Sequence, residues 1–353
     1  MVRGKSRRQL ATGRIRSFGR WTSSGCVRNI VILLLLLGVA AVGWVGYFAL
    51  EPLAVPESAR QFRVEQGASL RSVARQLATA GVLREPVTFV ALVRLLGRSG
   101  AVKAGIYELP DGITPYRLIG KLSRGEVSLS EITFIEGWTF AQIREALDAD
   151  PVVRHETAAL DDLEVLQRLK MPERHPEGLF FPDTYRFATG ASDLQILERA
   201  YRSMQARLAA AWERRAPGLP YQSPYDALIV ASLIEKETGR VEDRRMIAAV
   251  FTNRLKHGMR LQTDPTVIYG IGPMFDGNLR KRDLETDGPY NTYTRSGLPP
   301  TPIAMPGQAS IDAALDPAQS SALYFVARGD GTSQFSETLD KHNRAVQKYQ
   351  LRR

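Results

Sequence analysis

The pattern of hydrophobic and polar positions begins with an uncharged apolar run near the N-terminus. Residues 30–50 contain no charged side chain, and the run is long enough for one helix to cross a bilayer. Trp44 and Tyr47 lie toward its end, where interfacial aromatic residues are typical. A cleaved signal peptide is the alternative, but the run exceeds the usual h-region of roughly 7 to 15 residues and no clear A-x-A site follows it. We therefore expect a single-pass transmembrane helix.

Shorter periodic segments follow this run. Residues 51–60 contain two prolines and are typical of a linker. From residue 61 to about 130 the pattern changes between strand-like alternation and helical spacing, which predicts a small mixed domain. Residues 131–353 predict a larger mixed α/β domain, in which Thr139 and Gln142 have the spacing of a capping box. The expected fold class is α+β, with one N-terminal transmembrane helix, a small domain and a larger domain.

The small domain at 61–130 has a distinctive pattern of apolar, glycine and serine positions, namely Val64, Gly67, Ser69, Leu70, Val73 and Ala74. This pattern resembles a LysM module, a family that binds glycans containing N-acetylglucosamine. Ala68 stands where that family usually has an acidic residue. A plain spacer domain is the alternative interpretation.

Charge is concentrated at the N-terminus. The formal net charge is +10, and residues 1–29 contain eight basic residues and no acidic residue. This leaves 39 basic and 37 acidic residues for the rest of the chain, a net charge of +2, which argues against nucleic acid as a partner. The positive tail predicts a cytoplasmic N-terminus in the inner (plasma) membrane and an extracytoplasmic, periplasmic position for the domains after residue 51. The single cysteine, Cys26, precedes the apolar run and has no partner within the chain.

The most informative polar position stands at the end of an apolar helical run. Between residues 227 and 234 the only polar side chain is Ser232, so this helix is expected to pack on every side. Glu235 follows where the helix leaves the core, and the small residues Ala231 and Ser232 one turn back would leave room for a ligand. Desolvation disfavours an anion there, which suits a proton donor. The alternative is that Glu235 and Glu237 are solvated residues at a helix end.

The segment 176–187 is rich in aromatic residues and turn formers. Loops of this composition line carbohydrate grooves, because aromatic faces pack on sugar rings. The alternative is a loop that covers the core.

The larger domain contains a series of distinctive sequence blocks. The blocks are EGW at 136–138, FPDTY at 181–185, EKET at 235–238, VFTNRL at 250–255, RLQTDPTVIYG at 260–270, YNTY at 290–293, GLPPTPIAMPG at 297–307 and LYFVA at 323–327. This series resembles the YceG/MltG family of membrane-anchored endolytic murein transglycosylases. The similarity runs from about residue 51 to 350, in the order and spacing of that family.

The resemblance implies that residues 131–353 form a catalytic domain that cuts peptidoglycan glycan strands between N-acetylmuramic acid and N-acetylglucosamine without water. Glu235 would protonate the leaving oxygen and then take the proton of the C6 hydroxyl as a 1,6-anhydro ring closes. An ordinary glycosidase needs two carboxylates. Glu237 is a poor partner, because two positions along a helix rotate it about 200° from Glu235.

The same blocks imply residues that bind the substrate. These residues carry groups able to hold N-acetyl and hydroxyl oxygens, and they are Glu237, Gln262, Asp264, Asn291 and Tyr293. Asp264 precedes Pro265 and is equally suited to bracing a turn. The four histidines lack the spacing of zinc ligands, so we expect no metal and no cofactor.

Two functions from different classes remain open. One is an enzyme that cuts nascent strands beside membrane-bound wall synthases and terminates their elongation, with a penicillin-binding protein as a candidate partner. The other is a non-catalytic, peptidoglycan-binding scaffold for synthases, in which Glu235 is a structural acid. A conventional hydrolase is a third hypothesis.

Overall fold

The computed structural model describes residues 24–100 and 102–351 and has mixed α and β structure, which confirms the α+β expectation. Most of the predicted basic tail at 1–29 lies outside the described residues. The chain divides into two compact units. The first comprises residues up to Phe62, Gly67–Val102 and Leu109–Arg124, and the second comprises Arg63–Gln66, Lys103–Glu108 and the chain from Gly125 onward.

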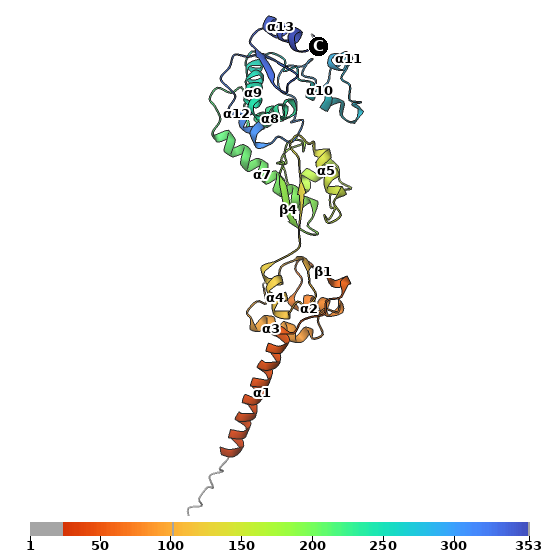
Figure 1. Ribbon diagram of the computed structural model, residues 1–353, viewed down its shortest axis with the longest axis vertical. Helices are drawn as coiled ribbons and strands as arrows, with labels where there is room; N and C mark the ends of the chain where they lie inside the picture. The colour runs from red at the N-terminus through yellow and green to blue at the C-terminus, as the bar shows by residue number, and fades with distance from the viewer. Residues whose placement is uncertain (1–23, 101, 352–353) are drawn as a thin grey trace, which may run out of the picture. The chain divides into compact units, whose positions relative to one another are not determined.

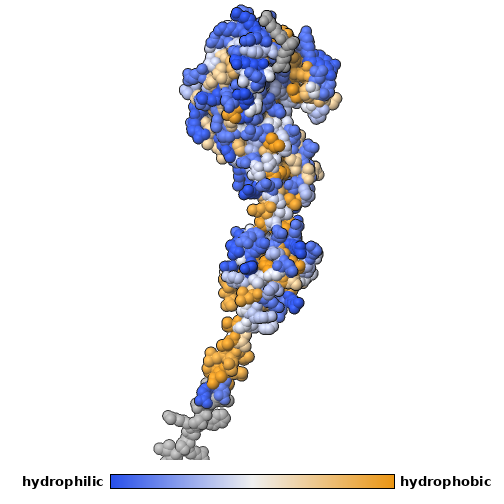
Figure 2. Space-filling model, viewed as in Figure 1, coloured by the Kyte–Doolittle hydropathy of each residue, from blue (hydrophilic) through white to orange (hydrophobic). Residues whose placement is uncertain are grey.

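The first unit begins with α1 (Ser24–Leu50), drawn at the red end of the colour scale in Figure 1. Its segment Arg28–Leu50 has a mean hydropathy of 2.5 and is exposed over its most apolar window (Figure 2). The unit continues with η1 (Glu57–Ala59), α2 (Leu70–Thr79), α3 (Pro86–Leu95) and α4 (Pro115–Arg124). Two short strands, β1 (Gln61–Val64) and β2 (Gly105–Glu108), pair with each other.

The core of the first unit comes from the apolar faces of its helices. Val73 and Leu77 of α2, Phe89 of α3 and Leu118 of α4 are each less than 1% exposed. Their spacing places these side chains on the inner face of each helix, so burial of apolar surface holds α2, α3 and α4 together.

The second unit contains two antiparallel strand pairs and a group of packed helices. Strands β3 (Leu129–Thr133) and β4 (Thr184–Ala188) place Ile132 opposite Tyr185. Strands β5 (Tyr324–Ala327) and β6 (Ser333–Ser336) place Phe325 opposite Phe335. The helices are α5 (Phe140–Ala149), α6 (Asp162–Arg168), α7 (Asp193–Glu213), α8 (Pro224–Glu237), α9 (Val241–Lys256), α10 (Asp264–Ile271), η2 (Gly272–Met274), α11 (Lys281–Glu285), α12 (Gln308–Leu315) and α13 (Leu339–Tyr349).

Helix α8 is the central element of the second unit. It starts at a capping box formed by Ser223 and Asp226, with Pro224 in the first turn. All residues from 227 to 234 are buried, because α7, α9, α10 and α12 contact this helix. The expected packing on every side is therefore confirmed, and Figure 1 shows α8, α9 and α12 grouped together. Glu235 leaves this core in the last helical turn.

Candidate active site

Glu235 is held by a cation and by a helix N-terminus. Its side chain is 6% exposed. Arg244 of α9 donates from Nη2 to Glu235 Oε1 at 3.2 Å, and the backbone N–H of Gly307 donates to Oε2 at 2.9 Å. Gly307 is the N-cap residue of α12, so the positive end of that helix faces the carboxylate. These two hydrogen bonds fix the orientation of the carboxyl group.

A second carboxyl, that of Glu136, lies beside this pair. Its Oε2 is 3.9 Å from Arg244 Nη2, and its side chain is 50% exposed. Partial burial raises the pKa of Glu136, the nearby Glu235 raises it further, and Arg244 lowers it. A Cβ atom at Gly307 would stand 1.9 Å from Glu136 Oε1. Only glycine at 307 therefore allows Glu136 to approach the start of α12.

Three of the sequence blocks meet over the end of α8. The N–H of Gly137 donates to the carbonyl of Met305 at 2.8 Å, and the N–H of Met305 donates to the carbonyl of Trp138 at 2.7 Å. Lys236 Nζ donates to the carbonyl of Gly137 at 3.3 Å. The EGW turn is thus paired with the proline-rich segment at 297–307, and both lie against the EKET motif.

The expected free space beside Glu235 is not present at Ala231 and Ser232. Both residues are fully buried. The Ser232 hydroxyl donates to the carbonyl of Ile229 at 2.7 Å and accepts the N–H of Ile303 at 3.0 Å. This expectation was wrong because the proline-rich segment covers the small residues.

Glu237 faces different partners from Glu235. Thr263 donates from Oγ1 to Glu237 Oε2 at 2.8 Å, and burial raises the pKa of Glu237. Next along the chain, Asp264 Oδ1 accepts a hydrogen bond of 2.5 Å from the hydroxyl of Tyr293. Burial also raises the pKa of Tyr293, and the bond to Asp264 acts in the same direction. Three of the predicted substrate-binding residues, Glu237, Asp264 and Tyr293, therefore belong to one group around the start of α10.

The side chain of Gln262 makes fewer hydrogen bonds than the side chain of Asn291. Gln262 is exposed and has a φ of +52°, which is unusual for a residue with a Cβ atom. Its Oε1 accepts from Arg254 Nη1 at 3.3 Å. Asn291 is 5% exposed. Its amide nitrogen donates within 3.2 Å to backbone carbonyls at residues 283, 284 and 286, and its Oδ1 accepts the N–H of Tyr293 at 2.8 Å.

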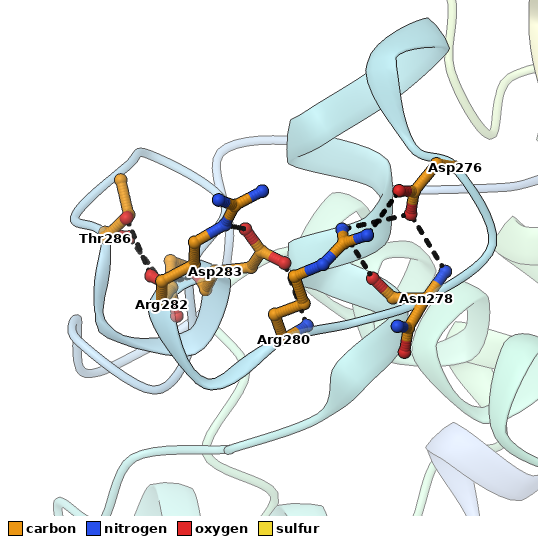
Figure 3. A network of polar contacts seen from close by, with 7 residues as sticks. Asp276, Asn278, Arg280, Arg282, Asp283 and Thr286 are labelled. Carbon is orange, nitrogen blue, oxygen red and sulfur yellow. Dashed lines mark hydrogen bonds and ion pairs between the residues drawn. The ribbon is translucent and has the colours of Figure 1, made fainter.

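The loop that Asn291 holds carries a polar network of its own. Figure 3 shows the guanidinium of Arg280 reaching both Asp276 and Asn278, and its ion pair to Asp276 Oδ2 is 2.6 Å long. The hydrogen bonds from Arg280 lower the pKa of Asp276. The N–H of Arg280 also donates to Asp283 Oδ2 at 2.8 Å, at the start of α11. The fold of this loop thus depends on pairs within the loop and on Asn291.

A cleft of about 670 Å³ starts next to Lys236. Its walls include Tyr269 and Tyr290, whose rings meet edge to face at 4.9 Å between centroids. Glu177 also lines the cleft and is 3% exposed. Aromatic walls with a few polar groups are typical of sites for sugars and other small molecules. Within residues 24–100 and 102–351, no cluster of three His, Cys, Asp or Glu side chains has the arrangement of a metal site.

Sequence reasoning did not identify Glu177. Its Oε1 accepts the N–H of Phe140 at 3.0 Å and its Oε2 accepts the hydroxyl of Tyr269 at 3.0 Å. Burial raises the pKa of Glu177 to about 7, although these hydrogen bonds oppose the shift. The only signal in the sequence was its place in the aromatic-rich segment 176–187. The aromatic residues of that segment are buried in the core, as the core-covering alternative expected, whereas Glu177 lines the cleft.

Most of the chain is similar to a known protein family and to known proteins. The YceG-like family matches residues 62–348. The chain is 36% identical over 303 residues to the endolytic murein transglycosylase of Bacillus subtilis, covering 81% of this chain and 83% of that protein. It is 26% identical over 357 residues to the endolytic murein transglycosylase of Streptococcus pneumoniae, covering 90% of this chain and 64% of that protein.

A solved structure is also similar. The crystal structure of a yceG-like protein from Listeria monocytogenes aligns with a TM-score of 0.52 and 31% sequence identity. The alignment covers 80% of this chain and 98% of that chain. The family match contains all six candidate site residues that the sequence predicted.

Proposed function

The chain belongs to the YceG-like family, and on this premise we propose that it is a membrane-anchored lytic transglycosylase that cuts nascent peptidoglycan strands internally. The relatives from two organisms are named endolytic murein transglycosylases, and the chain is an enzyme of that class. The proposed reaction breaks the bond between N-acetylmuramic acid and N-acetylglucosamine and leaves 1,6-anhydro ends, which would terminate strand elongation. The observation that carries the proposal is the carboxyl of Glu235, buried at the end of α8 between Arg244 and Gly307.

The proposed mechanism uses Glu235 first as an acid and then as a base. Its proton passes to the glycosidic oxygen as the C1–O bond of the muramic acid breaks, which gives an oxocarbenium-like ring. The C6 hydroxyl of the same sugar attacks C1, and its proton returns to Glu235. Between the two transfers the carboxylate is negative, and the hydrogen bonds from Arg244 and Gly307 stabilise that charge.

A conventional hydrolase is the second candidate, because Glu136 places another carboxyl beside Glu235. In that reaction a second carboxylate activates water or attacks the sugar. We favour the lytic reaction on the names of the relatives. In the proposed site, Glu136 positions Arg244 and the EGW turn and takes no proton from the substrate.

The remaining predicted residues are assigned to the substrate-binding wall. We propose that Glu237, Gln262, Asp264 and Tyr293 contact sugar hydroxyl and N-acetyl groups. Glu237, Asp264 and Tyr293 lie together at the start of α10, and Gln262 lies just before that helix in the chain. We propose that Asn291 acts through the loop that it holds, because its amide is occupied by backbone partners. The cleft beside Lys236 would receive a sugar against Tyr269 and Tyr290.

The position in the cell follows from α1. We propose that Arg28–Leu50 anchors the chain in the inner membrane with a cytoplasmic N-terminus, as its apolar length and the preceding cations suggest. We propose further that residues 61–130 form a LysM-like glycan-binding domain ahead of a catalytic domain at 131–353. A penicillin-binding protein or another wall synthase remains the proposed partner.

Replacing Glu235 by Gln tests the enzyme against the scaffold. The amide keeps an acceptor for the N–H of Gly307 but cannot act as the acid. Full-length enzyme with this change should lose at least about a hundredfold in cleavage of purified peptidoglycan, as expected for loss of a general acid. Circular dichroism should show that the variant is folded. Unchanged cleavage by a folded variant would remove Glu235 from the mechanism, and no cleavage by wild-type protein would favour the scaffold.

A further inference from the structure

An exposed apolar face runs along α3 in the first unit. Val87 and Leu95 are 80% and 75% exposed. Val90 and Ala91 lie between them at helical spacing on the same face. This face and α2 border a groove of about 550 Å³. Apolar side chains exposed as a contiguous group, and not singly, mark a surface for interaction.

Arginines border the same groove. Arg71 and Arg75 lie one turn apart on α2, and Arg94 lies on α3. All three are exposed, and no acidic side chain lines this groove in the part of the chain that the structure describes. Residues 66–103 contain six basic residues and one acidic residue, Glu85. The occupant that fits this surface therefore combines apolar and negatively charged parts.

The end of the apolar helix lies next to this surface. Helix α1 contacts α3 and α4 (Figure 1). Phe48 and Ala49, near its C-terminal end, are buried, whereas Tyr47 and Leu50 remain exposed. Helix α3 therefore lies beside the residues where α1 would leave the bilayer, within reach of the lipid headgroups.

We propose that the α2–α3 surface docks on the anionic phospholipid headgroups of the membrane that α1 crosses. This inference rests on the proposed membrane anchor. The apolar side chains of α3 enter the interface, and the arginines hydrogen-bond phosphate oxygens, which suit the guanidinium fork. Each arginine near an anionic membrane surface contributes roughly a fivefold factor to binding. Docking holds the first unit against the bilayer and leaves its opposite side free.

The test places a nitroxide spin label on the surface in the full-length chain. Val87→Cys carries the label in a Cys26→Ser background, and the protein is reconstituted in vesicles of phosphatidylcholine with or without phosphatidylglycerol. Val241→Cys is the matched control, since Val241 is an exposed valine of the second unit, 61% exposed. Collision with oxygen reports lipid contact, and collision with a water-soluble nickel complex reports exposure to water.

With phosphatidylglycerol present, the label at 87 should favour oxygen over nickel, whereas the label at 241 should remain accessible to nickel. Replacing Arg71, Arg75 and Arg94 by Gln should reduce the docked fraction, with a loss in the docking equilibrium of roughly two orders of magnitude at low salt. The same charge change at Arg168, Arg214 and Arg344, three exposed arginines of the second unit, should have no effect.

Two outcomes would overturn the inference. A label at 87 that is as accessible to nickel as the label at 241 would show a free surface, or one reserved for a protein that the vesicles lack. Equal docking after the arginine replacements would exclude phosphate recognition. Washing the vesicles with alkaline carbonate tests the anchor separately, because extraction of the chain would refute the membrane span, whereas retention with a water-exposed label would refute only the docking.

Discussion

Arg244 Nη2 lies 3.2 Å from Glu235 Oε1, and the two side chains are only 7% and 6% exposed. An ion pair of this kind is expensive to break, because the remaining charge stays buried without its partner. The Arg244 guanidinium also lies beside the carboxylate that becomes negative when Glu235 gives up its proton in the proposed reaction. The pair therefore contributes to the fold and to the chemistry together.

Replacing Arg244 by Met should separate these contributions. The variant leaves the Glu235 carboxylate without its cation, so the free energy of unfolding should fall by about 3 to 5 kcal/mol. Adding Glu235→Gln to Arg244→Met should restore part of this stability, because the uncompensated charge is removed, while activity stays lost. Guanidinium unfolding and cleavage of purified peptidoglycan measure both effects. Losses that simply add in the double variant would show that the two residues are not coupled.

Gly307→Ala should disturb the site through Glu136. The new Cβ atom would stand 1.9 Å from Glu136 Oε1, so the carboxylate must move from its place near Arg244. Turnover should fall by about tenfold or more, as for a loss of roughly 1.4 kcal/mol or more of transition-state stabilisation. Adding Glu136→Ala should lower turnover little further, because the displaced carboxylate has already lost its place near Arg244. Gly239→Ala is the control, because no atom lies within 4 Å of a Cβ atom at that position. Losses that simply add when the two changes are combined would contradict the steric explanation.

Glu177 predicts a pH dependence of stability. Burial raises its pKa from 4.5 to about 7, so the folded protein holds this proton more tightly than the unfolded chain. The contribution of protonated Glu177 to the free energy of unfolding is complete below about pH 4.5 and is lost as the pH rises through 7. Between pH 5 and 8, wild-type protein should lose roughly 3 kcal/mol that Glu177→Gln retains. Urea unfolding at constant ionic strength measures this difference, and parallel curves for the two proteins would contradict it.

Two replacements of Gln262 should differ in stability but not in activity. Its φ of +52° costs a side chain about 1 kcal/mol, a cost that glycine avoids. Gln262→Gly should therefore be more stable than Gln262→Ala by about 1 kcal/mol. Both variants should lose turnover to a similar degree, since both lack the amide. Full turnover in either variant would remove Gln262 from the substrate-binding wall.

Replacing Asn291 by Ala should destabilise the loop at residues 276–293. Loss of the amide leaves carbonyls at 283, 284 and 286 without their donor, which costs about 1 to 3 kcal/mol. Amide hydrogen exchange in residues 276–293 should accelerate, and turnover should fall with it. Gln262→Ala is the comparison, because it should lower turnover without changing exchange there. Lost turnover with unchanged exchange would instead indicate direct contact between Asn291 and the sugar.

Local rules were sufficient to predict the elements that position the site. The capping box of Thr139 and Gln142 is present at the start of α5, and the apolar run at 227–234 is buried as expected. Both features depend on residues within one helical turn or on one helix face. The resemblance to a family supplied Glu235, which periodicity alone did not distinguish from Glu237.

The partners of the site residues depended on tertiary structure. Arg244 reaches Glu235 only because α8 and α9 pack together, and its own helix gives no sign of that role. The space assumed beside Ser232 is filled by a segment about seventy residues later in the chain. Glu177 likewise gains its partners from α5 and α10. Contacts of this range leave no periodic signal in one sequence.

The most direct test of the central claim is mass spectrometry of the muropeptides that the full-length protein releases from purified peptidoglycan, beside its Glu235→Gln form. The account predicts ends that are one water lighter than hydrolysed ends, formed by wild-type protein and absent with the variant. Ordinary reducing ends would contradict it and would make Glu136 the first candidate for the second carboxylate of a hydrolase.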